Sequence, residues 1–237
     1  MLTQRPPTEP ASFASRESTP DWEQQMLSFG SFETTLFLID YDDTILASHW
    51  LAGQGLRLDS PAVPNEVMEK LKSLEAKAIE ILTLAATFGK VALVTNAEKG
   101  WIELSAQKFL PGIVPFLEKV RILSARTTFE HQYPGKTQMW KNEAYDLIFA
   151  EAFGSDAQLD TKYNVLSLGD SLYERSALMN LAKKMPNVVG KSVKLIERPT
   201  VSQLKKQLDI LIANLNTLTV SEESIDLMLT ADYITDY

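Results

Sequence analysis

Short apolar runs alternate with helix-like segments along most of the chain, and this alternation restricts the fold more than any other feature. The apolar runs are TTLFLID (34–40), VALVT (91–95), VRILSA (120–125), YNVLSLGD (163–170) and KSVKLI (191–196). A short apolar run without a polar residue at every second position is typical of a strand that is buried on both faces. Segments with apolar residues at helical spacing separate or follow these runs, at 64–88, 98–110, 137–153, 171–185 and 200–215. This order predicts an α/β fold, with a parallel sheet of about five strands flanked by helices.

The length and composition predict one main domain. The chain has 237 residues, of which 45% are hydrophobic, and this is enough for one sizeable α/β domain. We place that domain at residues 34–215. Residues 1–33 are rich in proline, serine and threonine, which predicts a partly disordered arm, and residues 216–237 are expected to form an acidic tail.

Charge and hydropathy narrow the classes of partner. The formal net charge of -8 disfavours nucleic acid and anionic membranes as partners, because both carry negative charge. No apolar run approaches the roughly 18 residues that a membrane span needs. We therefore expect a cytoplasmic protein that binds neither nucleic acid nor a membrane.

The supply of possible metal ligands is restricted to oxygen. The chain has no cysteine and only two histidines, so thiolate and multi-histidine metal sites are not expected. A bound metal ion would depend on carboxylate and carbonyl oxygens, which favours Mg²⁺.

Polar residues stand at the ends of three predicted strands. The first strand ends at Asp40, the second at Thr95, and the fourth at Asp170. Ligands of open parallel sheets bind beyond the carboxyl ends of the strands, so these side chains are expected to meet. Asp42 follows Asp40 closely enough to face the same cavity.

This set of residues suits phosphoryl transfer. Several carboxylates can lie close together only if a cation neutralises them or if some of them bind protons. One carboxylate can attack phosphorus and form an aspartyl phosphate, while its neighbour protonates the leaving group. Thr95, the backbone amide of Asn96 and a lysine would supply the hydrogen bonds and positive charge that phosphate oxygens require.

Three motifs, in order, resemble the haloacid dehalogenase (HAD) superfamily of phosphohydrolases. DYDDT fits the D-x-D-x-T signature of that family, VALVTN resembles its second motif, and VLSLGDSLYE resembles its fourth motif. The resemblance covers roughly residues 36–196 and implies a Rossmann-like core. It also implies that Asp40 is the nucleophile, that Asp42 is the acid/base, and that Thr95 holds the phosphate. Mg²⁺ would then be bound by Asp40, the Asp42 backbone carbonyl and Asp170.

The third motif of the family is a lysine near the start of the helix that precedes the fourth strand. Lys136 and Lys141 both qualify, and the short spacing that is usual in the family favours Lys141. Glu174 stands where the family's second acid is expected, one helical turn after Asp170. It could hold a metal-bound water or pair with the lysine.

Simpler interpretations of the motifs stay open. DYDDT could be a solvated acidic turn, Thr95 and Asn96 could cap the helix that follows them, and Asp170 could cap its own helix. A binding module with vestigial chemistry, or a phosphotransferase, would also fit the motifs.

The gaps between the motifs indicate the kind of substrate. Both gaps are nearly filled by segments that the core itself needs, so no sizeable cap domain is expected over the site. An open site favours a large phosphorylated substrate, with a phosphoprotein as the leading class and a small phosphomonoester as the alternative.

Overall fold

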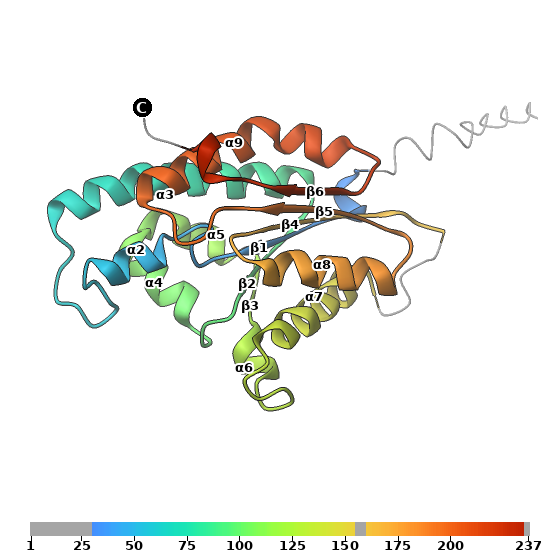
Figure 1. The fold of residues 1–237 in the computed structure, drawn as a ribbon, viewed down its shortest axis with the longest axis horizontal. Helices are drawn as coiled ribbons and strands as arrows, with labels where there is room; N and C mark the ends of the chain where they lie inside the picture. The colour runs from blue at the N-terminus through green and yellow to red at the C-terminus, as the bar shows by residue number, and fades with distance from the viewer. Residues whose placement is uncertain (1–29, 155–159, 235–237) are drawn as a thin grey trace, which may run out of the picture.

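The computed structural model describes residues 30–154 and 160–234 (Figure 1). These residues form one parallel sheet of six strands in the order β3-β2-β1-β4-β5-β6. The strands are β1 (Thr35–Asp40), β2 (Lys90–Thr95), β3 (Arg121–Ser124), β4 (Tyr163–Gly169), β5 (Val188–Lys194) and β6 (Ile225–Met228). The predicted α/β class and the predicted parallel sheet are confirmed.

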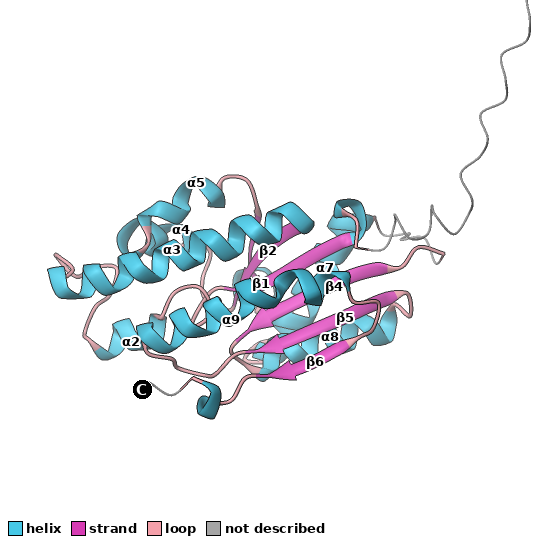
Figure 2. Ribbon diagram, turned by 90° about the horizontal axis from the view of Figure 1, so that it is seen from above, coloured by secondary structure: helices cyan, strands magenta, loops and turns pink. Residues whose placement is uncertain are grey.

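Helices cover both faces of the sheet. They are α2 (Ser48–Gly53), α3 (Asn65–Phe88), α4 (Trp101–Phe109), α5 (Val114–Leu117), α6 (Ala125–Phe129), α7 (Thr137–Phe153), α8 (Leu172–Lys184) and α9 (Val201–Val220), with short 3₁₀ turns at Phe32–Thr34, Pro111–Ile113 and Ala231–Tyr233. α3 and α9 lie on one face, and α7 and α8 lie on the other (Figure 2). No separate cap domain occurs in the described part of the chain, and none of its helices is both long and apolar enough to span a bilayer.

The central strand β1 shows why its sequence is apolar throughout. Phe37 and Ile39 belong to the core that packs under α3 and α9, whereas Leu36 and Leu38 belong to the core under α7 and α8. Successive side chains of a strand point to opposite faces, so a strand with helices on both faces needs apolar residues at every position. The burial of all six residues of β1 agrees with this explanation.

The prediction of an acidic tail from residue 216 was wrong for its first part. Residues 216–220 continue α9, and Ile225–Met228 forms β6, which pairs in parallel with β5. Asp226 is one of the acidic residues that suggested a tail, and its Oδ1 accepts a hydrogen bond of 2.9 Å from Arg175 Nε on α8. An edge strand needs only one partner and can be short and partly exposed, so it leaves little periodicity in the sequence.

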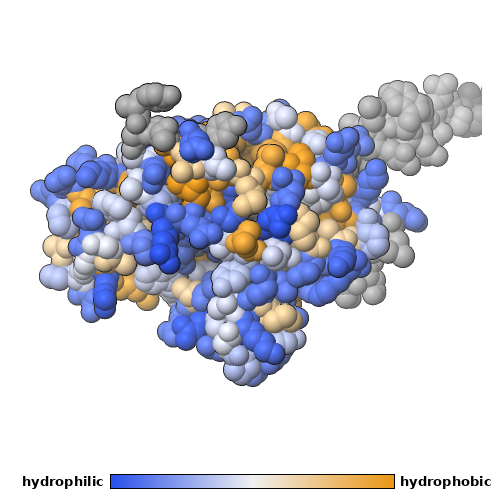
Figure 3. Space-filling model, in the orientation of Figure 1, coloured by the Kyte–Doolittle hydropathy of each residue, from blue (hydrophilic) through white to orange (hydrophobic). Residues whose placement is uncertain are grey.

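β6 also leaves apolar side chains at the surface. Leu227 and Met228 are exposed, and Figure 3 shows hydrophobic side chains gathered near this edge on a face that is otherwise largely hydrophilic. β5 begins at Val188, three residues before the predicted start at 191. Most of the predicted N-terminal arm lies outside the described residues.

The strand order places the functional edge of the sheet. From β1 the chain adds β2 and β3 on one side, and it then crosses to add β4, β5 and β6 on the other side. The boundary between β1 and β4 is therefore a topological switch point, beyond which ligands of open α/β sheets bind. Asp40 is the last residue of β1, and Asp170 follows the last residue of β4.

Candidate active site

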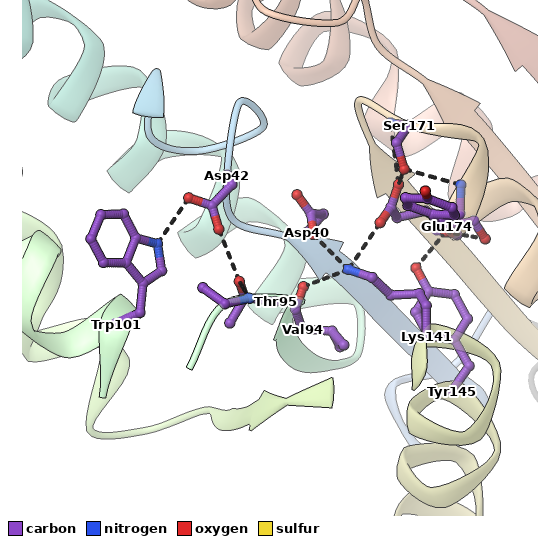
Figure 4. Close-up of polar contacts among 12 residues, drawn as sticks. Asp40, Asp42, Val94, Thr95, Trp101, Lys141, Tyr145, Ser171 and Glu174 are labelled. Atoms are coloured by element: carbon purple, nitrogen blue, oxygen red, sulfur yellow. Dashed lines mark hydrogen bonds and ion pairs between the residues drawn. The ribbon is translucent and has the colours of Figure 1, made fainter. Parts of the chain in front are cut away.

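The predicted site residues form two groups at the carboxyl edge of the sheet (Figure 4). The first group, which we call the lysine half, contains Asp40, Lys141 and Glu174. The second group, which we call the tryptophan half, contains Asp42, Thr95 and Trp101.

Lys141 is the centre of the lysine half. Its Nζ lies 2.6 Å from Asp40 Oδ1 and 2.9 Å from Glu174 Oε1, and it donates a 3.0 Å hydrogen bond to the Val94 carbonyl. Burial alone would lower the pKa of this ammonium group, but the carboxylates of Asp40 and Glu174 outweigh burial and raise it. Lys141 is therefore a buried, permanently charged cation directly beside the proposed nucleophile.

Glu174 supports Lys141 from the start of α8. Its Oε2 accepts hydrogen bonds from the Ser171 backbone nitrogen at 3.2 Å and from Ser171 Oγ at 2.5 Å. The first of these bonds forms a capping box with the Ser171 side chain, which accepts from the backbone of the first helical turn. Gly169 leaves room for this arrangement, because a methyl group there would collide with the Glu174 side chain. Burial opposes ionisation of Glu174, yet Lys141 and these hydrogen bonds lower its pKa. Of the two roles that the sequence allowed, the structure shows the pairing with lysine.

The lysine half carries more negative charge than Lys141 can neutralise. Burial raises the pKa of Asp40 well above its ordinary value despite Lys141, and Glu174, Asp42 and Asp170 raise it further. Burial also raises the pKa of Asp170 to about 7, with additional contributions from Glu174 and Asp43. A cation held by oxygen ligands would relieve this excess of charge.

The donors that could hold such a cation are few. Within residues 30–154 and 160–234, no three side chains of His, Cys, Asp or Glu form a ready metal cluster. Mg²⁺ commonly binds one or two carboxylates and takes water and substrate phosphate as its other ligands. The carboxylates of Asp40 and Asp170, which line the same cavity, fit that pattern. Glu174 fits it less well, because both of its oxygens already have partners.

The tryptophan half holds Asp42 with neutral donors. Thr95 Oγ1 donates to Asp42 Oδ2 at 2.9 Å, and Trp101 Nε1 donates to Asp42 Oδ1 at 2.8 Å. Thr95 Oγ1 in turn accepts a 2.9 Å hydrogen bond from the Ala97 backbone nitrogen. Both oxygens of Asp42 are thus oriented without a cation. Sequence reasoning missed Trp101, since an indole in a helix gives no sign of which acceptor it will reach.

The remaining predicted residues have different positions. Lys136 is exposed at the start of α7 and does not line the site cavity, so the structure brings only Lys141 to Asp40. Asn96 does line the cavity, and its Oδ1 is buried without a hydrogen-bond partner among the described residues. Such an unpaired acceptor is unusual in a protein interior and is more common where a ligand or water binds.

The capping interpretations do not fit the structure. Ser171, not Asp170, caps α8, and Gly100 occupies the cap position of α4. The acidic-turn interpretation applies only to Asp43, which has a left-handed backbone with φ of 55°. Asp43 Oδ1 accepts a 2.9 Å hydrogen bond from the backbone nitrogen of His49 in α2.

A cavity of about 850 Å³ opens beside the two halves. Asp40, Asp42 and Asp170 belong to its lining. The lining also includes residues of α2, of α4 and of the segments before and after α2, among them Leu46, Leu51, Leu56, Leu58, Trp101 and Phe109. The volume lies within the range of pockets that bind small molecules.

Comparisons with known proteins add no relative. No family model matches the sequence, and no curated protein or solved structure is significantly similar to the chain. The resemblance to the HAD superfamily therefore depends on the three motifs and their placement.

Proposed function

We propose that the protein is a Mg²⁺-dependent hydrolase of phosphomonoesters that works through an aspartyl phosphate on Asp40. The observation that carries this proposal is the contrast between Asp40 and Asp42. One is bound by a buried lysine, and the other is bound by neutral donors. Paired carboxylates in different environments commonly divide the roles of nucleophile and acid/base.

In the first step, Asp40 attacks phosphorus while the bond from phosphorus to the leaving oxygen breaks. Lys141 holds Asp40 Oδ1 at 2.6 Å, which leaves Oδ2 as the attacking atom. Protonated Asp42 gives its proton to the leaving oxygen.

In the second step, water attacks the phosphorus of the aspartyl phosphate and the bond to Asp40 breaks. Asp42, now ionised, takes the proton from that water, which returns both carboxylates to their starting states. Asp42 can serve both steps because its two hydrogen bonds fix where its oxygens point.

Positive charge and hydrogen-bond donors around the phosphate come from this chain. Lys141 supplies a fixed ammonium group beside Asp40, and the Thr95 hydroxyl contributes by holding Asp42. The backbone amide of Asn96 adds a further donor. Bound Mg²⁺, held by Asp40, Asp170 and the Asp42 carbonyl, would supply the charge that the phosphate and the clustered carboxylates need.

A substrate too large to be enclosed is the substrate class that we favour. The described residues include no cap domain, and the cavity opens to the surface past exposed residues of the loop after α2. A phosphorylated protein side chain could enter such a site. A small phosphomonoester is the alternative substrate.

The test measures phosphate release from a generic phosphomonoester with Mg²⁺ and with a chelator. We expect Asp40→Asn and chelation each to abolish release, because the first removes the nucleophile and the second removes the cation. Asp209→Asn, a surface carboxylate on α9, serves as the matched control and should keep full activity. Activity that survives both treatments would contradict the mechanism.

Two further measurements separate the related functions. Beryllium fluoride should bind at Asp40 as a phosphoryl analogue, whereas a pure binding module would not take it up there. Product analysis in the presence of competing alcohols distinguishes hydrolysis from transfer to another acceptor.

A further inference from the structure

The cavity beside the carboxylates begins where the leaving group must depart. Asp42, the proposed acid, must lie next to the leaving oxygen to protonate it. The Trp101 indole holds Asp42 Oδ1 at 2.8 Å, and the same residue lines the cavity. A leaving group that receives its proton from Asp42 therefore extends along the Trp101 wall.

The lining of this cavity is mainly apolar. Leu51, Leu56 and Phe109 are buried residues of the lining, and Leu58 is about one-third exposed. A hydroxyl-rich leaving group, such as a sugar, would lose its water here and find few partners.

Polar residues also belong to the lining of the cavity. Asn96 and Ser171 belong to the segments that follow β2 and β4, next to the carboxylates. His49, Arg57 and Asp59 are exposed, so they mark the opening. We call the part of the cavity that is lined by Leu51, Leu56, Leu58, Trp101 and Phe109 its apolar part.

The apolar wall is fixed in place before any ligand arrives. Lys108 Nζ on α4 donates a 2.7 Å hydrogen bond to the Leu58 carbonyl and a second one to the Ser60 carbonyl. The Arg57 backbone nitrogen donates to Ser60 Oγ at 2.9 Å. A wall that is already ordered costs less entropy on binding.

We propose that this apolar part of the cavity binds the leaving group of the substrate and that the leaving group is aromatic. A flat ring would bury apolar area and could make offset or edge-to-face contacts with Trp101 and Phe109. The substrate class is then an aryl phosphate, either a phosphotyrosyl side chain or a small aryl phosphate. This inference deepens the proposed function and depends on it for the position of the phosphate.

The first test compares the binding of two non-hydrolysable phosphonates in the presence of Mg²⁺, measured by calorimetry. Benzylphosphonate and ethylphosphonate share the same anionic group and methylene, so a difference in their affinities reports the replacement of a methyl group by a phenyl ring. We expect benzylphosphonate to bind roughly 10- to 100-fold more tightly, as the burial of a phenyl ring predicts. Equal affinities would overturn the inference.

Two exposed leucines provide a matched pair of variants. Leu58→Asn places an amide in the apolar wall, whereas Leu104→Asn makes the same change on α4 outside the cavity. Both leucines are partly exposed, at 36% and 54%, so neither change should unfold the chain. We expect Leu58→Asn to reduce the preference for benzylphosphonate roughly three- to tenfold. No reduction, or an equal reduction in Leu104→Asn, would contradict the assignment of the wall.

A third variant tests whether the ring needs the empty volume of the cavity. Ala52 is exposed and lines the cavity, so Ala52→Trp should fill part of it without disturbing the core. Benzylphosphonate should then lose affinity while ethylphosphonate keeps it. A loss of affinity for both ligands in the same proportion would count against a separate binding site for the ring.

Different experimental results would refute this inference and the proposed function. Binding of the phosphonates needs no turnover, so a ring preference without hydrolysis would refute the phosphatase and retain the aromatic site. Hydrolysis that depends on Asp40 without any ring preference would refute the aromatic site alone.

The last measurement compares kcat/KM for the two kinds of aryl phosphate, a phosphotyrosyl side chain of a protein and a small aryl phosphate. A phosphotyrosine peptide, free phosphotyrosine and 2-naphthyl phosphate represent the aryl class, and a phosphoserine peptide of the same sequence is the control. A higher value for the phosphotyrosine peptide than for free phosphotyrosine supports a protein substrate, and the reverse supports a small one. A higher value for the phosphoserine peptide than for all aryl substrates would overturn the inference.

Discussion

The lysine half and the tryptophan half present the same type of side chain, an aspartate, to the same cavity in opposite surroundings. Asp40 is buried against the Lys141 ammonium, whereas Asp42 accepts hydrogen bonds from a hydroxyl and an indole. The first arrangement places a cation beside one carboxylate and holds its Oδ1, and the second holds both oxygens of the other carboxylate with neutral donors. The difference shows that two aspartates in one short motif can have different surroundings, because side chains from different helices and strands contact them.

The largest expected effect comes from removing the proposed acid/base. Asp42→Asn should lower kcat roughly 10²- to 10⁴-fold for an ester with a poor leaving group, because the departing oxygen no longer receives a proton. The loss should be much smaller for p-nitrophenyl phosphate, whose leaving group needs no proton. Steady-state kinetics on both substrates provide the check, and an equal loss on both would remove the distinction between the two halves.

The next effect concerns the stability of the lysine half. Lys141→Met leaves Asp40 and Glu174 buried without their cation and should cost about 3–5 kcal/mol in the free energy of unfolding. The exposed Lys136 is the control, and Lys136→Met should change that energy by about 0.5 kcal/mol or less. Urea unfolding measures both variants, and similar stabilities for the two would contradict a central role for Lys141.

The negative charge that Asp170 adds beside the lysine half should appear in the pH dependence of stability. Asp170 has a pKa of about 7 in the folded protein and an ordinary value of 3.8, so between these values the folded state binds more protons than the unfolded state. The free energy of unfolding of the metal-free protein should therefore fall as the pH rises from about 4 to 7.

Asp170→Asn removes that contribution. Compared with the wild type, the variant should gain on the order of 1–3 kcal/mol at pH 8 and nothing near pH 4. Added Mg²⁺ should reduce the difference by stabilising the wild type. Denaturant titrations at several pH values measure it, and a difference that does not change with pH would count against a carboxylate with a raised pKa.

The smallest effect tests the indole of the tryptophan half. Trp101→Phe keeps an aromatic ring in the wall but removes the hydrogen bond to Asp42 Oδ1, which is worth about 1 kcal/mol. We expect kcat to fall roughly three- to tenfold with little change in KM. A loss confined to KM would mean that Trp101 contacts substrate without positioning Asp42.

The strands and helices differ in how clearly the sequence predicts them. The first four strands and the helix at 64–88 follow from apolar runs and helical spacing, because burial on both faces or on one face leaves a direct pattern. β6 was not predicted, because a short, partly exposed edge strand leaves no such pattern in the sequence. The acidic residues around it suggested a tail, although Asp226 in fact binds Arg175.

The candidate site divides in the same way. Asp40, Thr95 and Asp170 could be found in the sequence because the position of each depends on the end of its own strand, and parallel strands end at one edge. The choice of Lys141 over Lys136 was favoured by spacing, but only the structure shows the lysine 2.6 Å from Asp40. A contact between residues about one hundred positions apart depends on how α7 packs against the sheet.

The sequence by itself determined the class of fold, the edge at which the carboxylates meet and the chemistry that carboxylates can perform. These features depend on local periodicity and on strand ends, which the order of residues encodes directly. The tertiary structure alone decided that a lysine accompanies Asp40, that an indole accompanies Asp42, and that leucines and aromatic rings line the cavity beside them. Those features come from side chains on separate helices, which only the packing of α2, α4, α7 and α8 brings together.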